Sequence, residues 1–211
     1  MTINTKNIYL INEYLKHHSS TKLMIVTKNQ SIKDIKELIT SGHKLFGENK
    51  VQEANLKYQS LNFPEDLELH LIGPLQSNKV KNALKIFDVI QSIDRFSLVD
   101  EISKQKNKLP SAKTKNFFIQ VNIGEEVQKS GVQKKDLKDL YDYSVSKNLE
   151  ICGLMCIPPN IIDPSNYFKE MIKLRDSINK DLKLSMGMSN DYKIALNFQS
   201  DIIRIGSLIF E

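Results

Sequence analysis

One lysine stands where a buried strand is expected to end. Residues 22–28 read Lys-Leu-Met-Ile-Val-Thr-Lys, an apolar run typical of a strand, and Lys28 closes it. If the strand is buried on both faces, the amine at its end is partly desolvated, which favours the neutral amine over the ammonium. A neutral lysine amine attacks aldehyde carbons, so Lys28 is a candidate for covalent chemistry. Position alone favours the simpler interpretation, a strand-end lysine that reaches solvent.

Two segments near the C-terminus have the residues to hold a phosphate. Ser189 follows an expected strand and precedes an expected helix, so its hydroxyl and the next amides could meet one anion. Gly206 and Ser207 follow the last expected strand and offer amides and a hydroxyl. Arg204 shares a face with Gly206, and an arginine that points into a protein interior needs an acceptor. Taken singly, a helix N-cap for Ser189 and an outward salt bridge for Arg204 both stay open.

The elements that position these residues follow from alternating apolar and amphipathic stretches. Strands are expected at 22–28, 45–49, 68–73, 88–94, 116–122, 150–157, 183–188 and 201–206. Helices are expected between them at 32–39, 51–61, 77–86, 96–105, 136–147, 167–178 and 191–198, and an additional helix at 8–17 comes first. That helix could plug the N-terminal face of a barrel or cover one side.

Eight strands separated by helices predict an α/β fold, a single (β/α)8 barrel of TIM type over residues 1–211. Such strands run parallel, and eight parallel strands close naturally into a barrel. An open doubly wound sheet is the alternative, but the turn Thr27-Lys-Asn-Gln-Ser31 lacks the glycines that usually follow its first strand. The chain ends five residues after Gly206, so no full helix can follow the last strand, and we expect the barrel seam there to be less well covered.

The barrel brings the candidate residues together. Function in such barrels lies at the C-terminal ends of the strands, with phosphate sites often after strands seven and eight. Strands one and eight are neighbours in a closed barrel, so Lys28 and the phosphate site could lie one small ring apart. A ligand with an aldehyde and a phosphate on one ring is pyridoxal 5′-phosphate (PLP).

Composition excludes several other classes of protein. The formal charge of +5 is spread out, without the dense basic stripe and interleaved aromatics of a nucleic-acid binder. No apolar run approaches the roughly 18 residues of a membrane span. The two cysteines, Cys152 and Cys156, form neither a disulfide framework nor a zinc pattern, and we expect both to point to one face of a strand. We therefore expect a cytoplasmic protein that is a monomer and has no bound metal.

Several stretches resemble the pyridoxal phosphate homeostasis protein family, whose PLP-binding barrel is of the alanine-racemase N-terminal-domain type. They span nearly the whole chain in order. The stretches that begin at Phe46, His70 and Ser185 are highly specific. The matching stretches are Val26-Thr-Lys28, Phe46-Gly-Glu-Asn-Lys-Val-Gln-Glu53, His70-Leu-Ile-Gly-Pro-Leu-Gln-Ser-Asn-Lys79, Ser92-Ile-Asp94, Gln120-Val-Asn122 with Lys129-Ser-Gly131, Gly153-Leu-Met155, Ser185-Met-Gly-Met-Ser189 and Arg204-Ile-Gly206.

The resemblance implies roles for individual residues. It implies that Lys28 forms a Schiff base with PLP, that Ser189, Gly206 and Ser207 hold the phosphate, and that Arg204 faces the pyridine nitrogen. It also implies that Asn49, His70 and Met155 line the pocket. Arginine only donates hydrogen bonds, so it favours an unprotonated ring nitrogen, and the ring is then a weak electron sink.

The resemblance further implies a role in intracellular PLP (vitamin B6) and amino-acid homeostasis without robust catalysis, with PLP-dependent apo-enzymes as possible recipients. A PLP-dependent amino-acid racemase is one alternative, but racemases of similar fold need a second domain and its tyrosine. A barrel that binds a phosphorylated metabolite, with Lys28 as an electrostatic group, is the other. Asn29 is one departure, because similar proteins often have threonine after the lysine.

Overall fold

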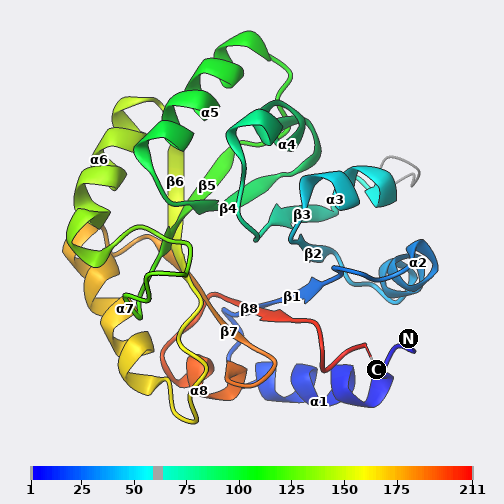
Figure 1. Cartoon of the computed structure of the whole chain (residues 1–211). Coiled ribbons are helices and arrows are strands. Elements are labelled where there is room, and N and C mark those ends of the chain that lie inside the picture. Colours follow the sequence, from blue (N-terminus) through cyan, green and yellow to red (C-terminus); the bar gives the residue numbers. More distant parts are fainter. Residues whose placement is uncertain (1, 59–63, 211) are drawn as a thin grey trace.

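The strands form one closed barrel. The computed structural model describes residues 2–58 and 64–210, and in it eight parallel strands follow each other in sequence order, with β1 also pairing with β8 (Figure 1). The strands are β1 Lys22–Val26, β2 Leu45–Glu48, β3 Glu68–Leu71, β4 Val89–Ile93, β5 Asn116–Val121, β6 Glu150–Cys156, β7 Lys183–Met188 and β8 Ile202–Ile205. The predicted (β/α)8 barrel is confirmed.

Helices cover the outside of this barrel. They are α1 Thr5–Leu15, α2 Ile32–Thr40, α3 Val51–Tyr58, α4 Val80–Ile86, α5 Phe96–Lys108, α6 Leu137–Ser146, α7 Ser165–Ile178 and α8 Tyr192–Asn197, with 3-10 turns η1 Ser77–Lys79 and η2 Lys134–Asp136. The last part of the helix expected at 51–61 lies outside the described residues. Ser31 caps α2 as expected, in a capping box with Asp34 that satisfies two backbone donors.

Helix α1 covers one side of the barrel, where it lies beside α8 in Figure 1. It begins at Thr5, earlier than expected, because the Asn4 side chain accepts a hydrogen bond from the Asn7 backbone and caps it. The Asn7 amide in turn donates to the Leu208 carbonyl at 2.8 Å. Ile209 and Phe210 are buried, so the seam after β8 is well covered and the expectation of a gap there is wrong.

Side chains alternate between the barrel interior and the helix-facing layer. An interior cluster contains Met24, Leu45, Val89, Phe118, Met155 and Ile202. The β5–β6 register shifts between Phe117 and Phe118, which reverses the alternation along β6. Cys152 therefore packs against the interior cluster, while Cys156 belongs to the larger cluster of buried residues between the strands and the helices. The expectation that both cysteines point to one face is wrong.

Among residues 2–58 and 64–210, no helix is long and apolar enough to cross a membrane.

Candidate functional site

A cavity of about 450 Å³ opens at the C-terminal ends of the strands. Six of the eight predicted site residues line it: Lys28, Asn49, Ser189, Arg204, Gly206 and Ser207. They come from the ends of β1, β2, β7 and β8, which the closed barrel brings to one mouth. The prediction that lysine and serines meet at one place therefore agrees with the geometry.

Lys28 lies two residues beyond the end of β1. Met24 belongs to the interior cluster and Val26 lines the cavity, so the alternation places Lys28 on the inward face as well. The side chain is exposed, so the expectation that the strand itself desolvates the amine is wrong for the chain alone. Within the described part of the chain, no ion pair or hydrogen bond of its amine is found, which leaves the nitrogen available to a ligand.

The backbone on both sides of Lys28 is held by helix α3. Lys57 donates from Nζ to the Thr27 carbonyl at 2.6 Å, and the Asn29 N–H donates to Glu53 Oε1 at 2.5 Å. Lys57 Nζ also meets Glu53 Oε1 at 2.6 Å, which joins the two supports. The peptide that carries Lys28 is thus fixed from behind, while its side chain has no such restraint.

A buried carboxylate completes this support. Glu48 is fully buried, and its Oε1 accepts from Lys57 Nζ at 3.0 Å and from the Thr27 hydroxyl at 2.8 Å. The Tyr58 hydroxyl lies 2.9 Å from the Thr27 hydroxyl and donates to it, because the single proton of Thr27 is already committed to Glu48. Burial raises the pKa of Glu48, and the nearby Lys57 opposes that shift. Glu48 and Glu53 lie in the stretch Phe46–Glu53, one of those that carry the family resemblance, but the sequence did not predict that they support the backbone.

Asn29 adopts a left-handed backbone conformation, with φ of 62°. Asparagine tolerates this region better than β-branched residues do, because its short polar side chain avoids the steric clash. The asparagine that replaces the threonine of similar proteins at this position therefore suits the turn that follows Lys28.

Arg204 points into the barrel and lines the cavity floor. It is only 3% exposed, and its guanidinium donates to the Ser185 carbonyl at 2.6 Å, the Ser185 hydroxyl at 2.9 Å and the Cys156 carbonyl at 2.7 Å. Burial lowers its pKa, which the charge of Asp191 opposes. The alternative of an outward arginine on a surface salt bridge is excluded.

The serines and the glycine lie at the β7 and β8 side of the cavity mouth. Ser207 is exposed and Ser189 is half-buried, so both hydroxyls are open to a ligand. Ser189 is not the N-cap of α8, because that helix begins later and Asp191 occupies the cap position. A Cβ at Gly206 would lie 3.2 Å from the Val26 carbonyl oxygen, so a side chain there would crowd β1.

His70 and Met155 do not line this cavity. Met155 is fully buried in the interior cluster, and His70 is buried deeper in the barrel, where it lines a second cavity of about 290 Å³ at the N-terminal ends of the strands. Both residues face the interior, but neither is among the residues that line the mouth with Lys28. A role for either in touching a ligand there stays a prediction without support from the geometry.

Two charged residues in the cavity were missed as site residues. Lys129 lines it and pairs with Glu126 at 2.5 Å. Asp191 lines it too, and burial raises the pKa of its carboxyl. Lys129 lies in the stretch Lys129-Ser-Gly131, so that stretch was the available signal, whereas nothing in the sequence marked Asp191. No tyrosine among the described residues lines the cavity, and no group of three or more His, Cys, Asp or Glu there could hold a metal ion.

Comparison with known proteins gives a consistent result. No family model matches the chain. The pyridoxal phosphate homeostasis protein of Aquifex aeolicus is 39% identical over 200 residues, which is 90% of this chain and 86% of that protein. The protein of the same name from Pasteurella multocida is 34% identical and covers 100% of this chain and 97% of its own length.

Solved structures agree in fold. PipY of Synechococcus elongatus without PLP has a TM-score of 0.88 and 29% identity, and covers 98% of this chain and 99% of its own. The PLP-bound form of PipY has a TM-score of 0.81 and 30% identity, and covers 95% and 100%. Alanine racemase from Bartonella henselae has a TM-score of 0.76 at 18% identity over 97% of this chain and 58% of its own, which shows a shared fold alone.

Proposed function

The chain belongs to the pyridoxal phosphate homeostasis protein family, and on this basis we propose that it holds PLP at the mouth of its barrel and serves PLP homeostasis. The cavity suits that ligand, because an amine, two hydroxyls and a guanidinium converge on it. In this proposal the Lys28 amine would hold PLP through its aldehyde carbon, whose oxygen would leave as water, and Ser189, Gly206 and Ser207 would hold the phosphate. Arg204 faces the pyridine nitrogen.

One observation carries the proposal: Lys28 and the donors after β7 and β8 open into a single cavity. Two serine hydroxyls and the backbone N–H at the close approach of Gly206 to β1 can all donate to a phosphate. The amine of Lys28 is held on a fixed peptide but is itself unpaired within the described residues, as a nucleophile must be. Asn49, half-buried on the β2 side, would border the ring.

The same residues argue against efficient turnover. When bound, PLP supplies an electron sink, and that property is greatest when its ring nitrogen is protonated. Arg204 has only donors to offer there, so it stabilises the unprotonated nitrogen. A racemase also needs a second acid–base group across the ring, and no tyrosine of the described chain lines the cavity. We therefore propose a carrier role, with PLP-dependent apo-enzymes as recipients, in a single cytoplasmic barrel that acts as a monomer.

An absorption experiment tests this proposal. The protein mixed with PLP is expected to develop a visible band, which borohydride removes while fixing the cofactor to the protein. Peptide mapping should then find the modification on Lys28. The Lys28→Ala variant should lose the band, whereas Lys36→Ala, which removes an exposed lysine from α2, should keep it.

Two results would contradict the proposal. Modification spread over many lysines, with no loss in Lys28→Ala, would mean that the cavity does not select PLP. Exchange of the amino-acid α-proton at a rate typical of PLP enzymes, abolished in Lys28→Ala, would favour the racemase instead.

A further inference from the structure

A continuous line of polar side chains crosses the barrel interior from the cavity to the opposite mouth. Arg204 Nη1 lies 2.9 Å from the Ser185 hydroxyl, which lies 2.7 Å from Gln91 Oε1. Gln91 Nε2 lies 2.7 Å from His70 Nδ1, and His70 Nε2 lies 2.8 Å from Glu68 Oε1. Ser185, Gln91, His70 and Arg204 are all at most 3% exposed, so water does not compete for these bonds.

The chemistry of the two ends gives this line a single direction. Arginine can only donate and an ionised glutamate can only accept. Ser185 accepts from Arg204, so its one proton goes to Gln91 Oε1. The amide of Gln91 then donates to His70 Nδ1, which leaves the proton of a neutral His70 on Nε2, facing Glu68. The hydrogen bond from His70 lowers the pKa of Glu68, in keeping with an ionised acceptor.

The reverse direction requires a different charge. If Gln91 turned its amide over, its oxygen would need a proton from His70 Nδ1, and Nε2 would still have to donate to Glu68. Only a doubly protonated imidazolium does both. The Ser185 proton would also lose its acceptor, and the hydroxyl beside Arg204 would be free to rotate. The protonation state of His70 therefore affects Arg204, three hydrogen bonds away along this line.

We propose that Ser185, Gln91 and His70 form a positioning line that fixes the Arg204 guanidinium at the floor of the cavity. Ser185 is the direct support, and Gln91 orients Ser185 by accepting its proton. His70 in turn orients Gln91. This places His70 in the function of the site without contact with a ligand. The inference rests on the proposed function, since Arg204 is there the partner of the cofactor ring.

The first test needs no cofactor. Nitrogen-15 NMR of the ligand-free protein at pH 7.5 resolves the ring nitrogens of its four histidines, and the His70 signals are those that vanish in His70→Gln. We expect a neutral ring with the proton on Nε2 and a bare Nδ1. A proton on Nδ1, alone or as an imidazolium, would overturn the proposal, because the line would then run the other way.

The second test uses three variants and the affinity for PLP. Gln91→Leu removes the acceptor of the Ser185 proton, and we expect binding about tenfold weaker, the equivalent of one hydrogen bond to a charged group. Gln91→Glu keeps that acceptor but cannot donate to His70, so binding should stay within about threefold of the original protein while His70 gains a proton on Nδ1. Ser144→Ala removes a buried hydroxyl that bonds only within α6 and should leave PLP binding and His70 unchanged.

The two tests separate the possible failures. Equal losses in Gln91→Leu and Gln91→Glu would overturn the positioning role, since only the general disturbance of the interior would then matter. If the original protein binds no PLP, the proposed function fails, and the histidine spectrum alone decides whether the line has the stated direction.

Discussion

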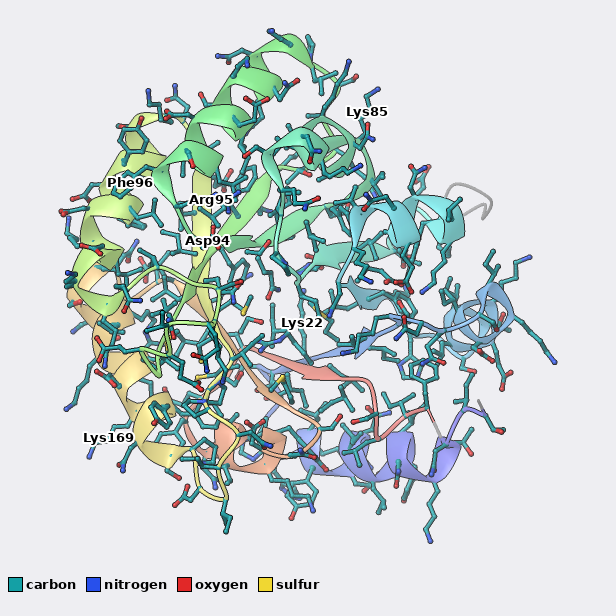
Figure 2. The ribbon with its side chains drawn as sticks, viewed as in Figure 1. Lys22, Lys85, Asp94, Arg95, Phe96 and Lys169 are labelled. Atoms are coloured by element: carbon teal, nitrogen blue, oxygen red, sulfur yellow. The ribbon has the colours of Figure 1, made fainter. Side chains whose placement is uncertain are left out.

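The two ends of β1 each carry a lysine on the inward face, and they are held in opposite ways. At the start of the strand, the Lys22 side chain itself is paired, 3.8 Å from Glu68, and it is labelled near the middle of the strand ring in Figure 2. At the far end, Lys57 and Glu53 hold the backbone on either side of Lys28, and the Lys28 amine is left unpaired within the described residues. Lys28 therefore combines a fixed backbone with an unpaired amine, which is what the proposed function requires of it.

The largest expected effect is on stability at the Lys28 end. Lys57→Met leaves Glu48 buried without its cation, and we expect a loss of about 3–5 kcal/mol in the free energy of unfolding. The matched change at the other end, Lys22→Met, breaks an exposed pair and should cost less than about 1 kcal/mol. Urea denaturation of the two variants compares them, and equal losses would show that β1 is supported alike at both ends.

The pH dependence of Lys57→Met identifies the group responsible. Burial already raises the pKa of Glu48, so the native state binds that proton more tightly than the unfolded state, and its contribution to stability falls as pH rises through the raised pKa. Without Lys57 the pKa rises further. The loss in Lys57→Met should therefore be greatest near pH 7 and shrink toward pH 4, about the ordinary pKa of glutamate. A loss that does not change with pH would exclude Glu48.

A smaller effect, on PLP binding, is expected when one of the hydroxyls after β7 and β8 that share the cavity with Lys28 is removed. Ser207→Ala should weaken PLP binding about tenfold, since it removes one hydrogen bond to a charged phosphate. The same variant should bind pyridoxal, which has the aldehyde but no phosphate, as well as the original protein does. Equal losses for both ligands in a titration would place Ser207 elsewhere than at the phosphate.

The smallest effect concerns the turn just beyond Lys28. Asn29→Val puts a β-branched residue at a φ of 62° and should cost about 1 kcal/mol, whereas Asn29→Gly, which accepts that conformation freely, should be close to neutral. Thermal denaturation measures both. If the two variants lost the same stability, the contact of the side chain would matter rather than the backbone conformation.

The sequence was sufficient to predict the barrel and six residues of its mouth. Strand and helix alternation reports the period of each element, and the rule that parallel strands end together places Lys28 near Ser189 and Ser207. The sequence did not show how far along its strand each inward-facing residue lies relative to the cavity. His70 and Met155 share the inward face, but only the observed register places them below the cavity.

The sequence pattern also did not predict which side chains hold the backbone from outside the barrel. Lys57 and Glu53 read as ordinary charges on an amphipathic helix, and only packing shows that they reach around to the peptides beside Lys28. The shift at Cys152 is similar, because a bulge changes which way a side chain points without altering the local composition.

The packing of α1 has a consequence for how the chain folds during synthesis. Its Asn7 bonds to Leu208, 201 residues later, so this contact of α1 forms only after β8 and Leu208 have been synthesised. At about 5–20 residues per second, the ribosome takes on the order of ten to forty seconds to cover that interval. During this interval, the apolar face of α1 with Ile8 and Ile11 lacks the part of its cover that the segment after β8 provides.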